Sequence, residues 1–188
     1  HITFVESDPL EALKNNFLST VNISKMCIKF KVPKMIFIST DKAVNPSNIM
    51  GATKRLCEKY IQMISKNSGT NFKILRFGNV LGSTGSVIPL FEKQIHNGGP
   101  ITITHPNITR YFMTIREAVE LVLISTFEKS IENGNINILE MGKPVKIKDL
   151  AERMIKLSGK ELNKDIRISY TELRKGEKLH EDLFYKDE

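Results

Sequence analysis

The segment from Lys34 to Lys54 constrains the fold of this 188-residue chain more than any other stretch. It begins with the apolar run Met35–Ile38, which is typical of a parallel strand buried on both faces. Four polar residues follow directly: Ser39, Thr40, Asp41 and Lys42. In open α/β sheets, ligands bind just outside the carboxyl ends of the strands. Hydroxyls, a carboxylate and an amine at this place predict a proton-transfer site; the alternative is that they only cap the following turn.

The second half of the segment predicts the start of a helix. Asn45–Asn48 has the composition of a turn, and either Ser47 or Asn48 is suited to cap a helix that begins near Met50. Met50 and Lys54 are four residues apart and therefore share one face of its first turn.

Strand-like and helix-like patterns alternate along the rest of the chain and predict an α/β protein with a parallel sheet. The predicted strands of that sheet are Met35–Ser39, Lys73–Phe77 and Ile136–Leu139. A further short strand is predicted at residues 101–104. Helices are predicted over about 9–30 with Asp8 as N-cap, from near 50 to 64, from near 86, over 115–127, and over 145–157.

The stretch STDKAVNPSNIMGATKR resembles the CapD-like branch of the UDP-N-acetylglucosamine 4,6-dehydratases, which are extended short-chain dehydrogenases/reductases. Most members of that larger group carry Tyr-x-x-x-Lys here, whereas the CapD-like branch has Met, as at Met50. The resemblance implies the carboxy-terminal portion of such an enzyme, with a partial Rossmann-type sheet and a small α/β substrate-binding domain. We expect residues 1–78 plus 113–140 to belong to the NAD(P)-binding domain and 79–112 plus 141–188 to the nucleotide-sugar-binding domain.

A dinucleotide-binding fold normally carries a Gly-x-Gly-x-x-Gly turn after its first strand, and this sequence has none. By the resemblance, the chain enters the family pattern after the fourth strand. We therefore expect a fragment of a longer protein, or a missing half supplied by another chain, with an exposed strand edge. We expect this chain alone to bind NAD(P) poorly.

The resemblance implies a lyase reaction that uses NAD or NADP as the hydride carrier. Carbon 4 of the hexose is oxidised, water is lost across carbons 5 and 6, and the hydride returns to carbon 6. Asp41 is the candidate acid and Lys42 the candidate base, which must be uncharged to act; burial or a neighbour such as Lys54 would favour that. Thr40 is expected to hold the 4-hydroxyl of the sugar, and Lys54 is expected to bind the nicotinamide ribose. Met50, at the position of the usual tyrosine, cannot ionise.

The resemblance also implies two sets of binding residues. The cofactor set is Asn16, Ser39, Lys54 and Phe77. The substrate set is Asn79, Ser86, Val87, Ile88, Arg110, Arg174 and Glu177, with Lys178 beside it. The residues alone favour a surface position for Asn16 as much as a place near the cofactor, and they favour a plain connecting loop at Gly82–Gly85. Lys175 stands where the family usually has proline.

Composition and charge limit the partners and the location that we expect for this protein. The net charge of +7 suits an acidic partner such as a UDP-sugar, and no aromatic-basic stripe supports nucleic-acid binding. No apolar run approaches the roughly 20 residues needed to span a membrane, and no signal peptide is recognisable. Two cysteines fit a reducing cytoplasm, and we expect the full-length parent there or at the inner face of the membrane. The histidines lack the spacing of a metal site. We expect a homo-oligomer.

The sequence leaves three alternatives to the dehydratase function. They are an epimerase or reductase of the same fold, a catalytically silent UDP-sugar-binding chain, and, on charge alone, a nucleic-acid binder.

Overall fold

The computed structural model describes residues 2–83 and 86–186, and the chain divides into two compact units. The first unit comprises His1–Gly78, Arg116–Glu140 and Asp182–Glu188. The second comprises Asn79–Ile115 and Met141–Glu181. The division of the chain by function into a cofactor-binding and a substrate-binding domain stays a prediction.

The first unit is built on the parallel three-stranded sheet that the sequence predicted. Its strands are β1 (Lys34–Thr40), β2 (Asn71–Phe77) and β7 (Ile136–Ile138), in the order β1-β2-β7. Thr40 is in register with Phe77, so β1 and β2 end at the same edge of the sheet. β1 is an outer strand among the described residues, and its Ile38 is 39% exposed.

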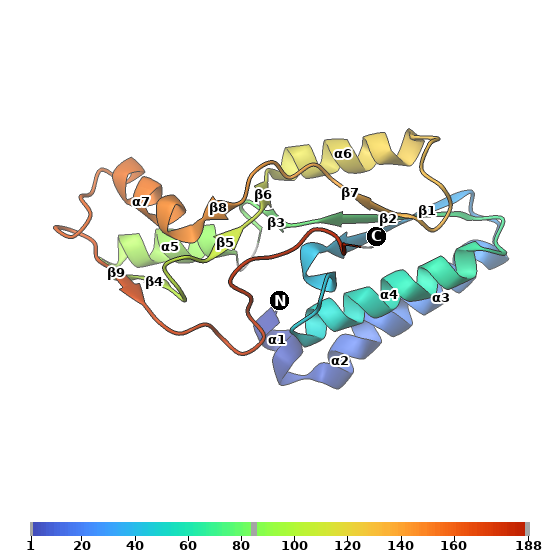
Figure 1. Ribbon diagram of the computed structural model, residues 1–188, viewed down its shortest axis with the longest axis horizontal. Coiled ribbons are helices and arrows are strands. Elements are labelled where there is room, and N and C mark those ends of the chain that lie inside the picture. The colour runs from blue at the N-terminus through green and yellow to red at the C-terminus, as the bar shows by residue number, and fades with distance from the viewer. Residues whose placement is uncertain (1, 84–85, 187–188) are drawn as a thin grey trace. The chain divides into compact units, whose positions relative to one another are not determined.

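Helices lie on both faces of this sheet, with α6 on one face and α3 and α4 on the other (Figure 1). They are α1 (Ile2–Ser7), α2 (Pro9–Leu13), α3 (Ser19–Lys29), α4 (Ile49–Ser65) and α6 (Ile115–Phe127). The Asp8 carboxylate accepts from the Glu11 amide, which confirms the predicted N-cap. The predicted helix from Pro9 to Phe30 is not α-helical throughout, because η1 (Lys14–Leu18) is a π-helical turn.

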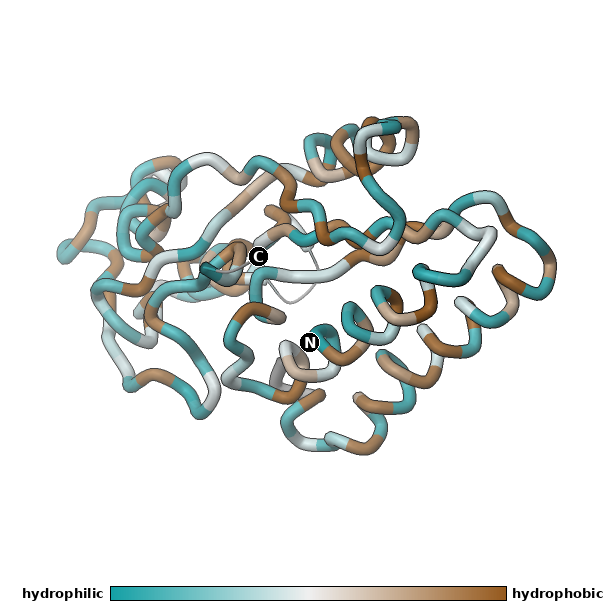
Figure 2. Tube along the Cα trace, turned by 45° about the vertical axis from the view of Figure 1, so that its right-hand side comes forward, coloured by the Kyte–Doolittle hydropathy of each residue, from teal (hydrophilic) through white to brown (hydrophobic). Residues whose placement is uncertain are grey.

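The core of the first unit lies between the sheet and α4. Five buried residues form it: Phe37, Cys57, Ile61, Phe72 and Ile74. The α4 residues among them are spaced four apart, which is why the helix keeps its apolar side on the sheet. Figure 2 shows how hydrophobic and hydrophilic residues alternate along the helices of the chain.

The second unit packs two helices, α5 (Val87–His96) and α7 (Ile147–Leu157), around a core of isoleucines. Its strands are short pairs: β3 (Asn79–Val80) with β6 (Phe112–Met113), β4 (Ile101–Ile103) with β9 (Ile168–Tyr170), and β5 (Thr109–Arg110) with β8 (Val145–Lys146). The last helix was predicted to start at Val145, which is wrong by two residues. Val145 pairs with Arg110 in a strand, and the helix begins at Ile147.

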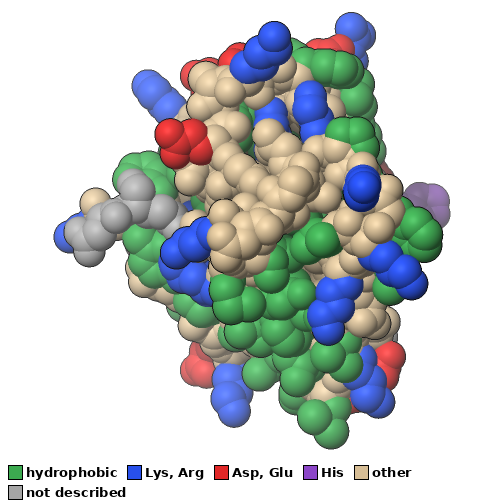
Figure 3. All heavy atoms as spheres, turned by 90° about the vertical axis from the view of Figure 1, so that its right-hand side faces the viewer, with side chains coloured by type: hydrophobic (Ala, Val, Ile, Leu, Met, Phe, Trp, Pro, Cys, Tyr) green, Lys and Arg blue, Asp and Glu red, His purple; other side chains and the backbone are tan. Residues whose placement is uncertain are grey.

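Exposed hydrophobic side chains occur at or near the carboxyl ends of three helices of the first unit. Next to the ends of α3, α4 and α6, Phe30 is 69% exposed, Met63 61% and Phe127 73%. Figure 3 shows one side of the molecule, on which hydrophobic side chains gather among lysines and arginines. Within residues 2–83 and 86–186, no helix is both long and apolar enough to cross a membrane.

Candidate active site

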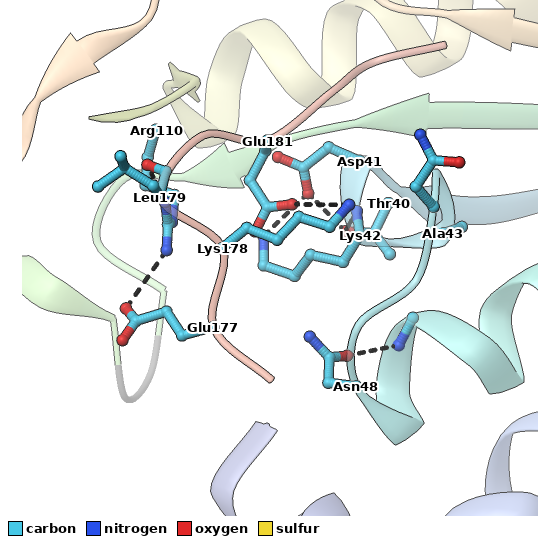
Figure 4. A network of polar contacts seen from close by, with 12 residues as sticks. Thr40, Asp41, Lys42, Ala43, Asn48, Arg110, Glu177, Lys178, Leu179 and Glu181 are labelled. Carbon is cyan, nitrogen blue, oxygen red and sulfur yellow. Dashed lines mark hydrogen bonds and ion pairs between the residues drawn. The ribbon is translucent and has the colours of Figure 1, made fainter. Parts of the chain in front are cut away.

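Thr40, Asp41 and Lys42 form one hydrogen-bonded cluster at the end of β1 (Figure 4). The Lys42 Nζ lies 2.8 Å from Asp41 Oδ1, and the Thr40 hydroxyl donates to the same oxygen at 3.0 Å. Asp41 is fully buried and Lys42 is 8% exposed. Asp41 Oδ2 is buried too, yet it has no hydrogen-bond partner among the described residues. The cluster thus joins a hydroxyl, an acid and an amine, as the sequence predicted.

The turn that carries Asp41 and Lys42 is held against the first turn of α4. Asp41–Ala43 form the short 3₁₀ helix η2, closed by a bond from the Val44 amide to the Asp41 carbonyl. Asn48 caps α4 through the Gly51 amide at 2.8 Å, which decides between the two predicted caps. At Gly51 a β-carbon would stand 2.0 Å from the Lys42 carbonyl oxygen, so only glycine allows this approach.

Lys54 lies one turn further along α4. Its Nζ donates to the Ile38 carbonyl at 2.9 Å and lies 4.7 Å from the centre of the Phe37 ring. Burial lowers the pKa of Lys54 below its ordinary value of 10.5, and the nearby Cys57 and Glu58 oppose that shift. One of its three donor positions is used in this contact. Met50, on the same face, is half-buried and offers no ionisable group.

The other predicted cofactor residues differ in their surroundings. Phe77 is half-buried at the end of β2, in register with Thr40. The Asn16 amide, within the π-helical turn η1, donates to the Thr53 hydroxyl at 2.9 Å. The Ser39 hydroxyl is buried and donates to Glu58 at 2.6 Å. Asn16 and Ser39 are therefore already bound to protein groups.

A buried charge network behind the site was not foreseen from the sequence. Glu58 and Arg76 are both fully buried and share two hydrogen bonds, of 3.1 Å from Nε and 2.8 Å from Nη2. Arg55 adds a 2.9 Å contact to Glu58. The helical spacing of Arg55 and Glu58, three residues apart, is a weak sequence signal for their contact, whereas nothing local pairs Glu58 with Arg76.

In the second unit, two predicted substrate residues are brought together. Arg110, 8% exposed, lies 3.3 Å from Glu177, and its Nη1 donates to the Thr109 and Leu179 carbonyls (Figure 4). Glu177 also accepts from the Arg174 amide at 3.1 Å, while Arg174 itself is exposed. A Lys178–Glu181 contact of 4.0 Å lies next along the chain, and the buried Glu181 was missing from the predicted set.

The remaining predicted substrate residues lie at the starts of β3 and α5. Asn79 opens β3, and Ser86 is the residue before α5. The Ser86 hydroxyl oxygen is buried without a hydrogen-bond partner among the described residues. Val87 packs against the core, and Ile88 is half-buried. Residues 84 and 85 of the predicted Gly82–Gly85 loop lie outside the described residues.

The fold and this cluster define a Rossmann-type α/β protein of the extended short-chain dehydrogenase/reductase class. All 188 residues match the family described as "Polysaccharide biosynthesis protein", and the chain belongs to that family.

Curated relatives agree with this placement. The chain is 53% identical to the capsular polysaccharide biosynthesis protein CapD of Staphylococcus aureus, covering 100% of the chain and 31% of that relative. It is 37% identical to an inverting UDP-N-acetylglucosamine 4,6-dehydratase of Campylobacter jejuni, covering 54% of it. It is 39% identical to a UDP-glucose 4-epimerase of Rickettsia rickettsii, and this match covers 52% of that relative. The chain thus spans between about a third and half of the length of these relatives.

Solved structures share the fold. Pen from Bacillus thuringiensis matches all of this chain with a TM-score of 0.90 and 38% identity, and the match covers 57% of that protein. DesIV of Streptomyces venezuelae, a dTDP-glucose 4,6-dehydratase solved with NAD bound, matches with a TM-score of 0.86 at 16% identity, covering 62% of its chain. Because the identity to DesIV is only 16%, that match supports the fold alone.

Proposed function

We propose that the intact protein carrying this chain is a nucleotide-sugar 4,6-dehydratase. It would convert UDP-N-acetylglucosamine to a 4-keto-6-deoxy sugar nucleotide for surface polysaccharide or glycan biosynthesis. The observation that supports this most is the buried Asp41–Lys42 pair directly after Thr40 at the carboxyl end of a parallel strand. The family and the relatives named for capsular polysaccharide and for UDP-N-acetylglucosamine dehydration support the same substrate class.

Loss of water across carbons 5 and 6 needs a base for the carbon-5 proton and an acid for the departing 6-hydroxyl. The Lys42 amine and the Asp41 carboxyl group lie 2.8 Å apart at the end of β1, so a base and an acid are held side by side. The reaction uses Lys42 in its neutral form and Asp41 in its protonated form, which differ from the ion pair by one proton moved across that contact. Lys42 then accepts the carbon-5 proton, and Asp41 protonates the leaving hydroxyl.

Thr40 and Asp41 Oδ2 supply the remaining polar contacts. The Thr40 hydroxyl sits at the end of β1 and can orient the 4-hydroxyl of the sugar. Asp41 Oδ2, which accepts no hydrogen bond from the described residues, is the oxygen left for the substrate. Met50 cannot exchange a proton, so it contributes contact alone.

The chain fits the nicotinamide end of NAD or NADP, because Lys54 lies near the end of β1 and uses one of its three donors on a described residue, the Ile38 carbonyl. Lys54 would bind the ribose there, next to Phe77. The sequence offers no Gly-x-Gly-x-x-Gly turn for the dinucleotide phosphates. When bound, the cofactor supplies reversible hydride acceptance.

For the substrate we propose that the second unit holds the nucleotide. Arg110 has a planar guanidinium of the kind that suits a diphosphate. It contacts Glu177, which also accepts from the Arg174 amide, and we propose that Arg174 faces the same ligand. The Ser86 hydroxyl before α5, which has no hydrogen-bond partner in the part of the chain that the structure describes, supports a polar contact to the same ligand. Asn79, Val87 and Ile88 complete the proposed pocket lining.

A 4-epimerase is the second candidate, because a Rickettsia relative carries that name. Epimerisation only removes and returns hydrogen at carbon 4, so it makes no use of an acid–base pair for carbons 5 and 6. The buried Asp41–Lys42 pair therefore favours the dehydratase.

The deciding experiment incubates the intact protein with UDP-N-acetylglucosamine and NAD⁺ or NADP⁺ in deuterated water. A dehydratase gives a product lighter by one water, with deuterium at carbon 5, whereas an epimerase gives an isomer of unchanged formula. Asp41→Asn and Lys42→Met should each lower the rate by about 10²–10⁴-fold. Lys59→Met, which removes an exposed amine from α4, is the matched control and should keep the rate. An isomeric product would reject the dehydratase.

Calorimetric titration of the 188-residue chain tests the silent-binding alternative. If the chain binds UDP-N-acetylglucosamine but neither dinucleotide, the substrate site lies in this chain, and the residues that bind the dinucleotide phosphates lie outside it. If the chain binds a dinucleotide tightly, our account of the missing glycine turn is wrong.

A further inference from the structure

We propose that the segment Leu183–Tyr185 positions the Asp41–Lys42 pair, with Tyr185 as a positioning residue. The inference rests on the proposed function only for its kinetic consequence. Every group it uses belongs to the first unit, although the segment lies about 140 residues beyond the turn that it contacts.

The Tyr185 hydroxyl bridges two backbone groups at the end of the catalytic turn. It donates to the Ala43 carbonyl at 3.1 Å and accepts from the Asn45 amide at 2.9 Å. Ala43 directly follows Lys42, and Val44 between the two bonded groups is fully buried. One hydroxyl therefore uses both its donor and its acceptor capacity on a single turn.

That turn has a backbone that needs support. Asn45 adopts a φ of +41°, in the left-handed region that residues other than glycine rarely occupy. Such a conformation persists where the surroundings hold it. The Gly51 side of α4 restrains the turn at the Lys42 carbonyl, and Tyr185 restrains it one and three residues later, at Ala43 and Asn45. The turn is held from both sides.

Tyr185 is itself held by the buried charge network. The Arg55 guanidinium carbon lies over the Tyr185 ring, 4.3 Å from its centre, and Arg55 binds Glu58 at 2.9 Å. Glu58 binds Arg76, whose Nη1 donates to the Leu183 carbonyl at 3.0 Å. The interactions thus form a closed circuit from Tyr185 through Arg55, Glu58 and Arg76 back to Leu183.

The circuit also reaches the strand that precedes the catalytic residues, because the Ser39 hydroxyl donates to Glu58 at 2.6 Å. Removing one member of a buried ion pair leaves the other charge uncompensated, so such a network tolerates little displacement. The backbone on both sides of Thr40–Lys42 is therefore tied to one rigid group of residues. This arrangement is suited to hold an acid and a base at a fixed separation.

The test is Tyr185→Phe in the intact protein, which removes the hydroxyl and keeps the ring against Arg55. Tyr60→Phe is the matched control: it lies in the same unit, and its ring contacts Phe17. We expect Tyr185→Phe to lower kcat about tenfold with KM within about twofold, because the acid and base are misplaced while the substrate contacts stay. The pH profile of kcat should shift as well, which a loss of stability alone would not cause. Tyr60→Phe should change neither.

A second readout is independent of the reaction. Hydrogen exchange at the Asn45 amide should become about tenfold faster in Tyr185→Phe, because that amide loses its acceptor. Unchanged exchange at Asn45 would overturn the inference, as would faster exchange with an unchanged kcat and pH profile. If the wild-type protein forms no 4-keto-6-deoxy product, the proposed function fails, and the exchange measurement alone decides whether Tyr185 holds the turn.

Discussion

The α-carbon of Gly51 lies against the Lys42 carbonyl so closely that a β-carbon at position 51 would stand 2.0 Å from that oxygen. The neighbouring atoms are backbone and the Pro46 ring, the latter 3.2 Å away, so no flexible side chain can move aside. The first turn of α4 and the turn that carries Asp41 and Lys42 therefore define each other's position. This relationship makes the placement of the proposed acid and base sensitive to one methyl group.

Gly51→Ala should displace the Asp41–Lys42 turn. We expect a loss of about 1–3 kcal/mol in the free energy of unfolding, because the added methyl group meets a packed backbone. The rate of product formation should fall with it. Gly69→Ala is the control, since a β-carbon at position 69 meets no atom within 4 Å. Urea denaturation of both variants checks the prediction; equal midpoints would contradict the close contact.

The buried environment of Lys54 should be visible in its titration. Burial lowers its pKa in the folded protein below 10.5, so the unfolded chain holds this proton to higher pH than the folded chain does. Between the lowered pKa and 10.5, the free energy of unfolding that Lys54 contributes therefore rises with pH. Below that range Lys54 is charged in both the folded and the unfolded chain, and the full cost of burying its charge is present. NMR of ¹³C-methylated lysines measures the pKa directly, and Lys54→Arg identifies the signal. A midpoint at or above 10.5 would refute burial of this amine.

Lys73 should stabilise the carboxyl end of α6. Its amine, on the central strand β2, donates to the carbonyls of Ser125, Thr126 and Glu128. Lys73→Met keeps the stem and removes the donors, so we expect a loss of about 1–3 kcal/mol in unfolding free energy. Lys129→Met, at an exposed position nearby, should change the urea midpoint little. Equal effects of the two substitutions would mean that the bonds of Lys73 contribute nothing specific.

Lys175→Pro should be tolerated and slightly stabilising. Residues 174–177 form a turn in which the Glu177 amide donates to the Arg174 carbonyl at 2.9 Å and Gly176 has a φ of +76°. These are features of a type II turn, whose second position favours proline. We expect about 0.4–1 kcal/mol of added stability, because proline restricts the unfolded chain. Gly176→Ala should do the opposite, and thermal unfolding of both variants checks the pair.

Much of the first unit follows from local sequence pattern. The apolar run after Lys34, the strand ending at Phe77 and the i, i+4 spacing of α4 predicted the parallel sheet and its main helix correctly. The side-by-side placement of Thr40, Asp41 and Lys42 was also predictable, because consecutive residues at a strand end cannot lie far apart. Local pattern failed where a distant strand competed, as at Val145, which pairs with Arg110 instead of starting a helix.

The sequence alone therefore determined the elements and the polar side chains that stand together at the end of β1, because propensity, periodicity and adjacency act between neighbours in the chain. Only the tertiary structure decided what holds that chemistry in place. The bonds of Tyr185 to the Ala43–Asn45 turn and of Arg76 to Glu58 join residues that are distant in sequence, and no local pattern encodes them. The close approach at Gly51 and the left-handed backbone of Asn45 likewise arise only when the folded chain brings its parts together.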